Sequence, residues 1–566
     1  MLGLHIADVI VIILYLIGIT IIGVRSARLV KNLGDFFMPR KFGKTMLIMH
    51  TFGTGTHSDQ AVTVASKTYT TGLSGIWYQW LWLFATPFYW LIAPVMRRFR
   101  AVTTADVFEA RFSKSVSMLY AVTGILQLMV TIGLMLKGSG AVVASAFDGT
   151  VSTNLAIAVM TVLFVVYGIA GGLNAAIITD FIQGILTIIF SFLLLPVVMN
   201  AVGGMDGLRA VIADPHMFSL VAPSEIGFFY IAVIALNGLI GIVTQPHTMG
   251  NTAAGRTEMD GRVGFTIGSF LKRSCTVAWT LTGFGAIAYY AGQDVDPDQV
   301  FGLIAKDFLP GIMPGMLGIF LASLLASVMS SCDSFMIASS ALFTENIYKP
   351  LQAGRKQNHY IMVGRIASLC IVAGGVIFAF WLPGVVKGLE IFWKISPMMG
   401  IAFWLGLFWR RTTVKGAWAA TLAGFFVWWL TEQSFFLSTL ASLPLADSLL
   451  VADGSGGVSM YLPWQMVFYL SAGGIMGILV SLLTQPLGDQ QLDKFYELVR
   501  TPVNIEEDNP EKPCTLPENI VVPPKDKMFP RSKNLEILMP DKISIIGFLC
   551  SWGAVVLLIA VFFIIT

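Results

Sequence analysis

Apolar runs of about 20 residues recur along the whole chain, and they restrict its fold more than any other feature. The first covers residues 5–24 and the last covers 543–566, and each is long enough to cross a bilayer as a helix. Only 12% of the residues are charged, about half of the share usual in soluble domains. The strands of a membrane β-barrel would be short and alternating. The sequence therefore predicts an all-α polytopic membrane protein.

About fourteen such segments are expected, and the loops between them predict how the chain crosses the membrane. Lys and Arg gather in the loops after the first, third, ninth and eleventh segments, whereas the alternate loops are acidic or nearly uncharged. Because short loops rich in Lys and Arg stay cytoplasmic, we expect a multi-pass protein of the plasma (inner) membrane with both termini outside. The expected segments are 5–24, 45–66, 74–96, 116–146, 153–170, 173–201, 227–247, 263–291, 311–347, 360–382, 387–409, 413–437, 462–484 and 543–566.

Five regions are expected along the chain. The one without an apolar run is 485–542, whose proline-rich and mixed-charge composition predicts an extended cytoplasmic linker and not a domain. The regions are an N-terminal helix with a cytoplasmic loop (1–44), a ten-helix core (45–409), two additional helices (410–484), the linker (485–542) and a C-terminal helix (543–566).

Two of the expected membrane helices are interrupted. The segment 45–66 contains GTGTHSD at residues 53–59, and the segment 227–247 runs into GIVTQPHTMG, where Pro246 lacks a backbone donor and disfavours helix just before it. Unwound backbone inside a membrane is tolerated where it lines a cavity or is buried in protein, and its carbonyl groups can bind a cation. The five-segment spacing of the breaks predicts two matching halves, while a simple kink is the alternative for either break alone.

Two acidic side chains lie in expected membrane segments, where an ionised group is costly and is usually paired or functional. Asp180 lies near the start of 173–201, and Asp333 lies near the middle of 311–347. At 100° per residue, five serines fall on one face of the second segment, with Asp333 beside them. Oxygen atoms on one helix face suit a small hard cation such as Na⁺, and close helix packing through small residues is the alternative. The serines are Ser323, Ser327, Ser330, Ser331 and Ser334.

Longer motifs resemble the sodium/solute symporter family. GGLNAAIITDFIQ, at residues 171–183, is similar to the family's Gly-Gly…Thr-Asp…Gln signature, and LASVMSSCDS with the later FTENIY is similar to its Ser-Ser…Phe-Thr…Ile-Tyr signature. GLFWRRTTVKGAW and VGRIAS match further family stretches, and the resemblance extends from about residue 34 to about residue 430. It implies a leucine-transporter-type five-plus-five inverted repeat over 45–409, the transport core. The long linker before the last helix resembles the sodium/glucose cotransporter branch.

The resemblance also implies where Na⁺ binds, as one or two coupling ions. A first site would join carbonyl groups of the first break to a serine-rich turn of 311–347. Some family members have a second site at the signature aspartate, and Asp333 is an extra carboxylate that could tighten this site or bind a proton. The first site would use Gly53, Thr56, Ser327, Ser330 and Ser331, and the second would use Asp180, Ser330, Asp333 and Ser334.

Polar contacts to a solute are implied at both breaks and on neighbouring helices. Lys137 lies in an apolar setting and could meet a solute carboxylate or an internal aspartate, whereas a structural ion pair or snorkelling is the alternative for Lys137 and for Lys272. The glutamines could equally form interhelical hydrogen bonds. His57 could make coupling pH-sensitive or could bond to backbone. The expected solute-binding residues are Asp59, Gln60, Gln79, Lys137, Asn237, Gln245 and Lys272.

The function expected from these residues is Na⁺-coupled symport of a small polar organic solute by alternating access, with a sugar favoured. A carboxylate or amino-acid-like solute is the alternative, since QPH at residues 245–247 is similar to the amino-acid and pantothenate branches. A transport-deficient membrane sensor would need a signalling domain, and an enzyme would need a nucleophile–base set or metal ligands, for which the six histidines lack the spacing. We expect no enzyme and no nucleic-acid partner. The expected partners are the solute, sodium ions and the lipid bilayer, with the oligomeric state left open.

Overall fold

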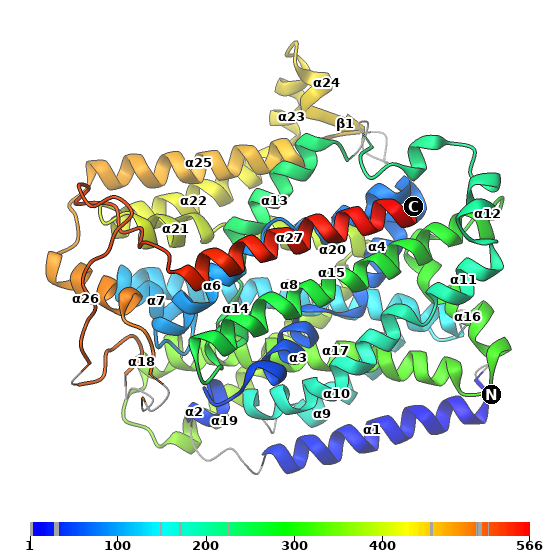
Figure 1. The fold of residues 1–566 in the computed structure, drawn as a ribbon, viewed down its shortest axis with the longest axis horizontal. Coiled ribbons are helices and arrows are strands. Elements are labelled where there is room, and N and C mark those ends of the chain that lie inside the picture. The colour runs from blue at the N-terminus through cyan, green and yellow to red at the C-terminus, as the bar shows by residue number, and fades with distance from the viewer. Residues whose placement is uncertain are drawn as a thin grey trace.

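Helices account for nearly all of the structure, and most of them run along one shared direction (Figure 1). Within the described residues the strands are β1 (Leu450–Ala452) and β2 (Val458–Met460), which form one antiparallel pair on a small outgrowth of the bundle. The prediction of an all-α membrane fold is therefore confirmed. The computed structural model describes residues 4–27, 33–147, 150–168, 172–222, 226–452, 457–504, 507, 512–518 and 520–566.

Most helices follow one another with short connections, and the longest connection lies between α26 and α27. Those in the first part of the chain are α1 (Ile6–Ala27), α2 (Leu33–Phe37), α3 (Lys44–Gly55), α4 (Ser58–Thr71), α5 (Trp77–Trp80), α6 (Thr86–Arg98), α7 (Thr104–Arg111), α8 (Lys114–Ala146), α9 (Thr153–Gly168), α10 (Gly172–Phe192), α11 (Leu195–Ala201) and α12 (Gly204–Val211). Those that follow are α13 (Phe228–Ile242), α14 (Pro246–Ala253), α15 (Glu258–Tyr289), α16 (Val300–Ile312), α17 (Met316–Ala341), α18 (Lys349–Leu351), α19 (Gln357–Trp381), α20 (Val385–Ile395), α21 (Gly400–Phe408), α22 (Val414–Thr431), α23 (Ser434–Ala441), α24 (Ala446–Leu449), α25 (Leu462–Leu483), α26 (Asp489–Arg500) and α27 (Lys542–Ile565).

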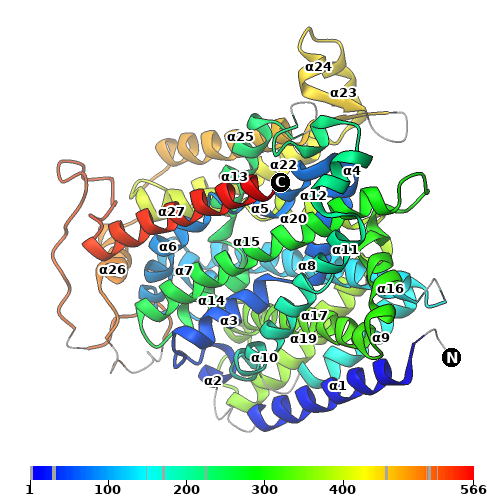
Figure 2. The same cartoon turned by 45° about the vertical axis from the view of Figure 1, so that its right-hand side comes forward.

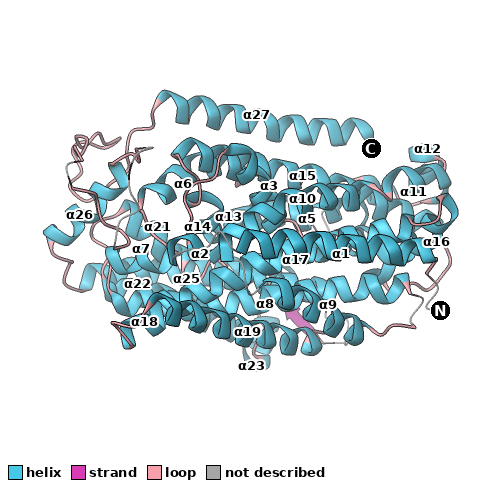
Figure 3. Ribbon diagram, turned by 90° about the horizontal axis from the view of Figure 1, so that it is seen from below, coloured by secondary structure: helices cyan, strands magenta, loops and turns pink. Residues whose placement is uncertain are grey.

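Eight helical segments in the described part of the chain are long and apolar enough to cross a bilayer, and the bent pair α13 and α14 makes a ninth if it counts as one span. Every expected segment coincides with one or more helices, but some, such as 45–66 and 74–96, are divided into shorter pieces. The total of fourteen crossings therefore stays a prediction. Both termini lie toward the same end of the bundle (Figures 1 and 3), and the placement of that end outside the cell stays a prediction as well.

Both expected helix breaks are present. Thr56 and His57 separate α3 from α4 and have extended backbone conformations. Residues 243–245 separate α13 from α14, and the axes of these two helices differ by 68°. Pro246 is the first residue of α14, a position where the missing N–H of proline leaves no helical hydrogen bond unmade.

Two glycines of α15 allow this helix to pack directly on the backbone of α3. A Cβ atom at Gly264 would lie 2.5 Å from the Cβ of Leu47, and one at Gly268 would lie 2.7 Å from the carbonyl oxygen of Ile48. Small residues of this kind let membrane helices approach closely. The contact brings α15, which carries Lys272, beside the first broken helix.

The region expected to be an extended linker contains helix α26, which its proline-rich composition did not predict. This helix buries Leu492, Phe495, Tyr496 and Val499, which are spaced like one face of a helix. The Gln491 side-chain amide also donates hydrogen bonds to two carbonyl groups at the end of α7. The segment is therefore packed on the bundle by apolar contacts.

We call the described part of residues 489–541 the strap, because it crosses one end of the bundle (Figures 1 and 2). Ion pairs fix it there: Arg100, after α6, pairs with Glu507, and Arg410, after α21, pairs with Glu536 at 3.0 Å. The Arg100 side chain has no exposed surface. The strap therefore ties together helices from both matching halves of the core.

Candidate ion and solute sites

The first helix break meets two other helices in the interior of the bundle. The Ser331 hydroxyl on α17 donates a hydrogen bond of 3.0 Å to the carbonyl oxygen of Gly53 on α3. The Ser330 hydroxyl donates one of 2.5 Å to Oδ1 of Asp180 on α10. A Cβ atom at Gly53 would lie 2.6 Å from the Ser330 hydroxyl, so glycine is needed for this approach. Residues from three expected segments thus meet at one buried point.

His50, one turn before Gly53, completes the surroundings of Asp180. Its Nδ1 atom lies 2.5 Å from Oδ2 of Asp180 and 3.3 Å from the Thr54 hydroxyl. The Thr54 hydroxyl lies 2.9 Å from the Ser334 hydroxyl, which brings this predicted residue into the same network. His50 was absent from the predicted site. Its spacing of three residues from Gly53, which places both on one helix face, is the signal that could have identified it.

Oxygen atoms remain available for a cation at the first break. Thr56 Oγ1 and Ser327 Oγ are buried and have no hydrogen-bond partner among the described residues. Buried polar atoms are normally paired, and Na⁺ binds hydroxyl and carbonyl oxygens of this kind at unwound helices. Asp333 is 2% exposed and lies on the same helix as Ser327. The donor set therefore fits the predicted cation.

At the second break, protein donors also bind the backbone carbonyl groups. The Thr248 hydroxyl donates to the carbonyl oxygen of Ile242 at 2.9 Å, and the Tyr120 hydroxyl donates to that of Thr244 at 2.9 Å. The Gln245 side-chain amide donates to the Ser396 hydroxyl at 3.2 Å. The first break differs in the buried Thr56 hydroxyl, which has no partner among the described residues, and is therefore better suited to a cation.

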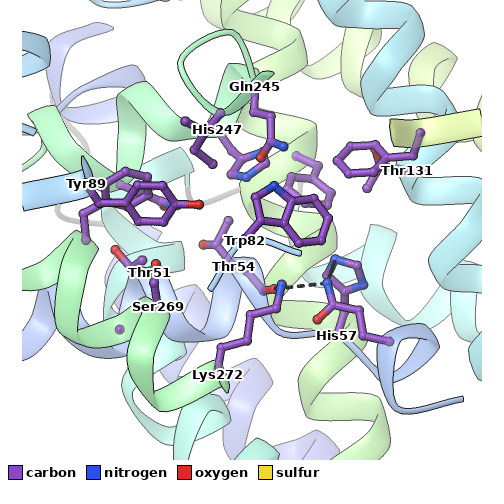
Figure 4. A pocket seen from close by; sticks show the side chains of 18 of the residues that line it. Thr51, Thr54, His57, Trp82, Tyr89, Thr131, Gln245, His247, Ser269 and Lys272 are labelled. Carbon is purple, nitrogen blue, oxygen red and sulfur yellow. Dashed lines mark hydrogen bonds between the residues drawn. The ribbon is translucent and has the colours of Figure 1, made fainter. Parts of the chain in front are cut away.

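A cavity of about 70 Å³ lies beside the first break. Figure 4 shows side chains from several helices turned toward the space around Trp82. Of the seven expected solute contacts, Gln60, Gln245 and Lys272 line this cavity. It is enclosed by parts of α3, α4, α6, α8, α13, α14, α15, α17 and α20, so that both halves of the core contribute to its wall.

Two of the cavity side chains hold the end of the broken helix. The Lys272 ammonium group donates a hydrogen bond of 2.5 Å to the carbonyl oxygen of Gly55 and lies 5.5 Å from the centre of the Trp82 ring. The Gln60 amide donates to the same carbonyl oxygen at 3.2 Å. The cavity wall is therefore joined by hydrogen bonds to the backbone of Gly55, two residues from Gly53.

Asn237 and Gln79 lie away from the cavity wall. The Asn237 amide donates to the carbonyl oxygen of Trp393 at 3.0 Å and accepts from the Tyr469 hydroxyl at 2.6 Å. Gln79 is fully buried, and its side-chain amide has no hydrogen-bond partner among the described residues. Their roles in solute binding stay predictions.

Asp59 and Lys137 are also outside the lining of this cavity. Asp59 is fully buried and pairs with His57, and a Cβ atom at Gly138 of α8 would lie 2.5 Å from the Asp59 Cβ. His57 bonds to side chains and not to backbone: its other nitrogen lies 3.0 Å from the Gln60 amide. Lys137 is half-buried and makes no hydrogen bond or ion pair with any residue that the structure describes.

Most of the cavity residues were not predicted from the sequence, among them Trp82, His247, Asn251 and Arg273. His247 and Asn251 also line a second cavity of about 30 Å³, whose wall includes His50. Their place on the first turns after the second break is a signal that the sequence offered. The two cavities share these two side chains, and the second cavity borders the ion-binding network at His50.

The comparisons with known proteins agree with this architecture. The model of the sodium:solute symporter family matches residues 36–424. The chain belongs to this family. It is 25% identical over 447 residues to the high-affinity proline transporter PutP of Bacillus subtilis (strain 168), which covers 76% of this chain and 88% of that protein. It is 24% identical over 435 residues to the sodium/glucose cotransporter of Vibrio parahaemolyticus, with coverages of 69% and 77%.

The fold is shared with a solved structure of a Na⁺-coupled sialic acid symporter in a substrate-bound, outward-open state. The TM-score is 0.69 at 18% sequence identity, over 85% of this chain and 99% of that one. The leucine-transporter-type inverted repeat expected from the motifs is thus confirmed as the fold. Family and fold together make this chain a multi-pass, Na⁺-coupled solute symporter and not an enzyme.

Proposed function

We propose that this symporter binds a small polar organic solute in the cavity beside the first helix break and carries it across the membrane with Na⁺ by alternating access. The hydrogen bond from Ser331 to the Gly53 carbonyl supports this most directly, because it links the broken helix to α17 where oxygen atoms gather. Lys272 and Gln60 hold the Gly55 carbonyl nearby. Ion and solute therefore act on the same few residues of backbone.

Na⁺ would bind oxygen atoms of both helices and favour the conformation in which the helices stay joined. The unsatisfied hydroxyl groups of Thr56 and Ser327 support this assignment. The proposed ligands of the first ion are Gly53, Thr56, Ser327, Ser330 and Ser331, and Asp180, Ser330, Asp333 and Ser334 would hold a second ion if the coupling number is two.

The driving force is sufficient for accumulation of solute. A unit charge crossing 100 mV releases about 2.3 kcal/mol, and a tenfold concentration gradient adds about 1.4 kcal/mol. One Na⁺ per neutral solute would therefore sustain roughly a few hundredfold accumulation. The ten-helix region 45–409 would perform this transport, with the remaining helices around it.

Two classes of solute have support in the cavity and among the relatives. A sugar is supported by the side-chain amides of Gln60 and Gln245 and by the sodium/glucose cotransporter of Vibrio parahaemolyticus. A carboxylate or amino-acid-like solute is supported by the ammonium group of Lys272 and by the proline transporter of Bacillus subtilis.

Uptake into proteoliposomes tests the proposed function. Labelled solutes of both classes are offered with an inward Na⁺ gradient, with an equal K⁺ gradient, and to liposomes without protein. We expect uptake of at least one solute that requires both the protein and Na⁺, and a higher Na⁺ requirement in Asp180→Asn. Uptake that is equal in Na⁺ and K⁺ would contradict Na⁺ coupling.

A further inference from the structure

The central cavity contains two cationic side chains and no acidic one among the described residues that line it. Lys272 and Arg273, which are neighbours on α15, both contribute to its wall. The centre of the Trp82 ring lies 5.5 Å from the Lys272 ammonium nitrogen and 5.8 Å from the guanidinium carbon of Arg273. The cavity therefore has a cationic side.

Neither cation has a carboxylate partner in the part of the chain that the structure describes. Lys272 donates to the neutral Gly55 carbonyl, and Arg273 donates to the carbonyl of Gln79 at 3.2 Å, while its Nε atom is buried without a partner. By contrast Lys394, also buried, pairs with a carboxylate at 2.9 Å. Because charges inside a membrane protein are normally paired or functional, an anionic group of the solute is the missing partner.

Two amide oxygens in the same cavity require hydrogen-bond donors from the solute. Gln60 Oε1 and Asn251 Oδ1 are buried and accept no hydrogen bond from the described residues. The orientation of the Gln60 amide is fixed, because its nitrogen donates to the Gly55 carbonyl at 3.2 Å. A buried acceptor is expected to be paired, so the solute must also present N–H or O–H donors.

The size and charge of the cavity restrict the size of the solute and the kind of donor group that it can carry. The cavity of about 70 Å³ has room for about five water molecules. In the liquid, five water molecules occupy on the order of 150 Å³, which is the volume of a solute of roughly ten non-hydrogen atoms. An ammonium donor would bring a third positive charge beside Lys272 and Arg273, whereas hydroxyl groups satisfy the amide oxygens without adding charge.

We propose that the solute is a small hydroxycarboxylate anion, with its carboxylate beside Lys272 and Arg273 and its hydroxyl groups donating to Gln60 and Asn251. This inference rests on the proposed function, and it names the class of solute that the cavity takes. A neutral sugar would bring no negative charge to the two cations, and a zwitterionic amino acid would bring its carboxylate together with a third positive charge.

Thermal stability of the purified protein in Na⁺ and in K⁺ provides the test. The probes are glycerate and gluconate, the neutral amide of each acid, glucose and proline. We expect one of the two acids to raise the melting temperature in Na⁺, with its amide at least tenfold less effective by concentration. Lys272→Gln should weaken the response to that acid at least tenfold, and Lys272→Arg should retain most of it. Lys387→Gln, which removes an exposed cation outside the cavity, is the matched control.

The outcomes separate this inference from the proposed function. If glucose, an amide or proline stabilises the protein in Na⁺ and neither acid does, the hydroxycarboxylate assignment is wrong while Na⁺ symport stands. If no probe changes the melting temperature in Na⁺, the assignment is also rejected. Should Lys272→Gln fail to fold, the comparison of each acid with its own amide on the unaltered protein decides the question.

Discussion

His50 Nδ1 lies 2.5 Å from Oδ2 of Asp180, although 130 residues separate the two along the chain. The other carboxylate oxygen accepts the Ser330 hydroxyl at 2.5 Å, so donors from α3 and α17 both bind an acid on α10. The costly buried carboxylate is thereby satisfied by the same two helices that form the proposed ion site. The pair therefore joins α10 to the proposed ion site.

Removal of the histidine should therefore destabilise the protein. His50→Ala leaves one oxygen of a buried carboxylate without a donor, and a hydrogen bond to such a group contributes about 2 kcal/mol. We expect a lower melting temperature in Na⁺-free buffer and partial recovery in His50→Gln, which retains a donor. His216→Ala, at an exposed histidine, should leave the melting temperature unchanged. An unaltered melting temperature in His50→Ala would show that the pair contributes nothing to the fold.

Loss of the Ser331 hydroxyl should weaken Na⁺ binding and leave the fold intact. Ser331→Ala removes one oxygen of the proposed first site and the hydrogen bond to the Gly53 carbonyl. We expect the Na⁺ concentration for half-maximal uptake to rise about tenfold, which corresponds to about 1.4 kcal/mol. Ser438→Ala, on the outlying helix α23, is the matched control. An unchanged Na⁺ dependence in Ser331→Ala would remove this residue from the ion site.

Two glycines at the same break should respond differently to a methyl group. A Cβ atom at Gly53 would lie 2.6 Å from the Ser330 hydroxyl, whereas one at Gly55 would meet nothing within 4 Å. We expect Gly53→Ala to abolish Na⁺-dependent uptake, because α3 and α17 can no longer approach. Gly55→Ala should keep the Na⁺ dependence of its uptake, although Gly55 also lines the solute cavity. Equal uptake by the two variants would mean that this close approach is not required for coupling.

Short-range patterns were enough to predict the helix breaks, whereas the meeting of Asp180 with Ser330 was implied by the family resemblance. Gly, Thr and Pro in an apolar run indicate unwound backbone. A carboxylate in a membrane segment indicates that another residue or an ion binds it, but not which one. The cavity wall was harder to predict, because Trp82 and Asn251 are brought together by helix packing that no local spacing encodes. Asn237 and Gln79 were expected there from their positions in the resembling family, and neither lines the cavity.

Helix α26 shows a different reason for a missed element. The prediction of an extended chain used the overall composition of residues 485–542, which is rich in proline. That overall composition does not reveal the short apolar helix face formed by Leu492, Phe495, Tyr496 and Val499. These residues recur at intervals of three and four, so the helical signal was present within twelve residues. The ion pairs that hold the strap join distant positions and were beyond the reach of local patterns.

The strap should contribute strongly to stability through Arg100. This side chain is fully buried, pairs with Glu507, and donates to the carbonyl oxygens of Arg98 at 2.9 Å and of Pro502 at 3.1 Å. Arg100→Ala leaves a buried carboxylate unpaired, which typically costs about 3–5 kcal/mol. We expect a lower melting temperature and faster proteolytic cleavage of the strap.

An exposed ion pair supplies the control for the strap. Arg209 lies 3.9 Å from Asp206 at the surface, where such pairs contribute little. Arg209→Ala should therefore behave like the unaltered protein in both measurements. If Arg100→Ala also does so, the Arg100–Glu507 pair does not hold the strap in place.

The charge moved in each transport cycle follows from the solute and from the number of ions. A hydroxycarboxylate anion carried with one Na⁺ moves no net charge, whereas two Na⁺ would move one positive charge. Because both oxygens of Asp180 already have protein donors, we expect one Na⁺ per solute. Accumulation in proteoliposomes should then be the same at 0 mV and at −100 mV, set by K⁺ and valinomycin. A second Na⁺ would instead raise it about 50-fold at −100 mV, since a unit charge then contributes about 2.3 kcal/mol.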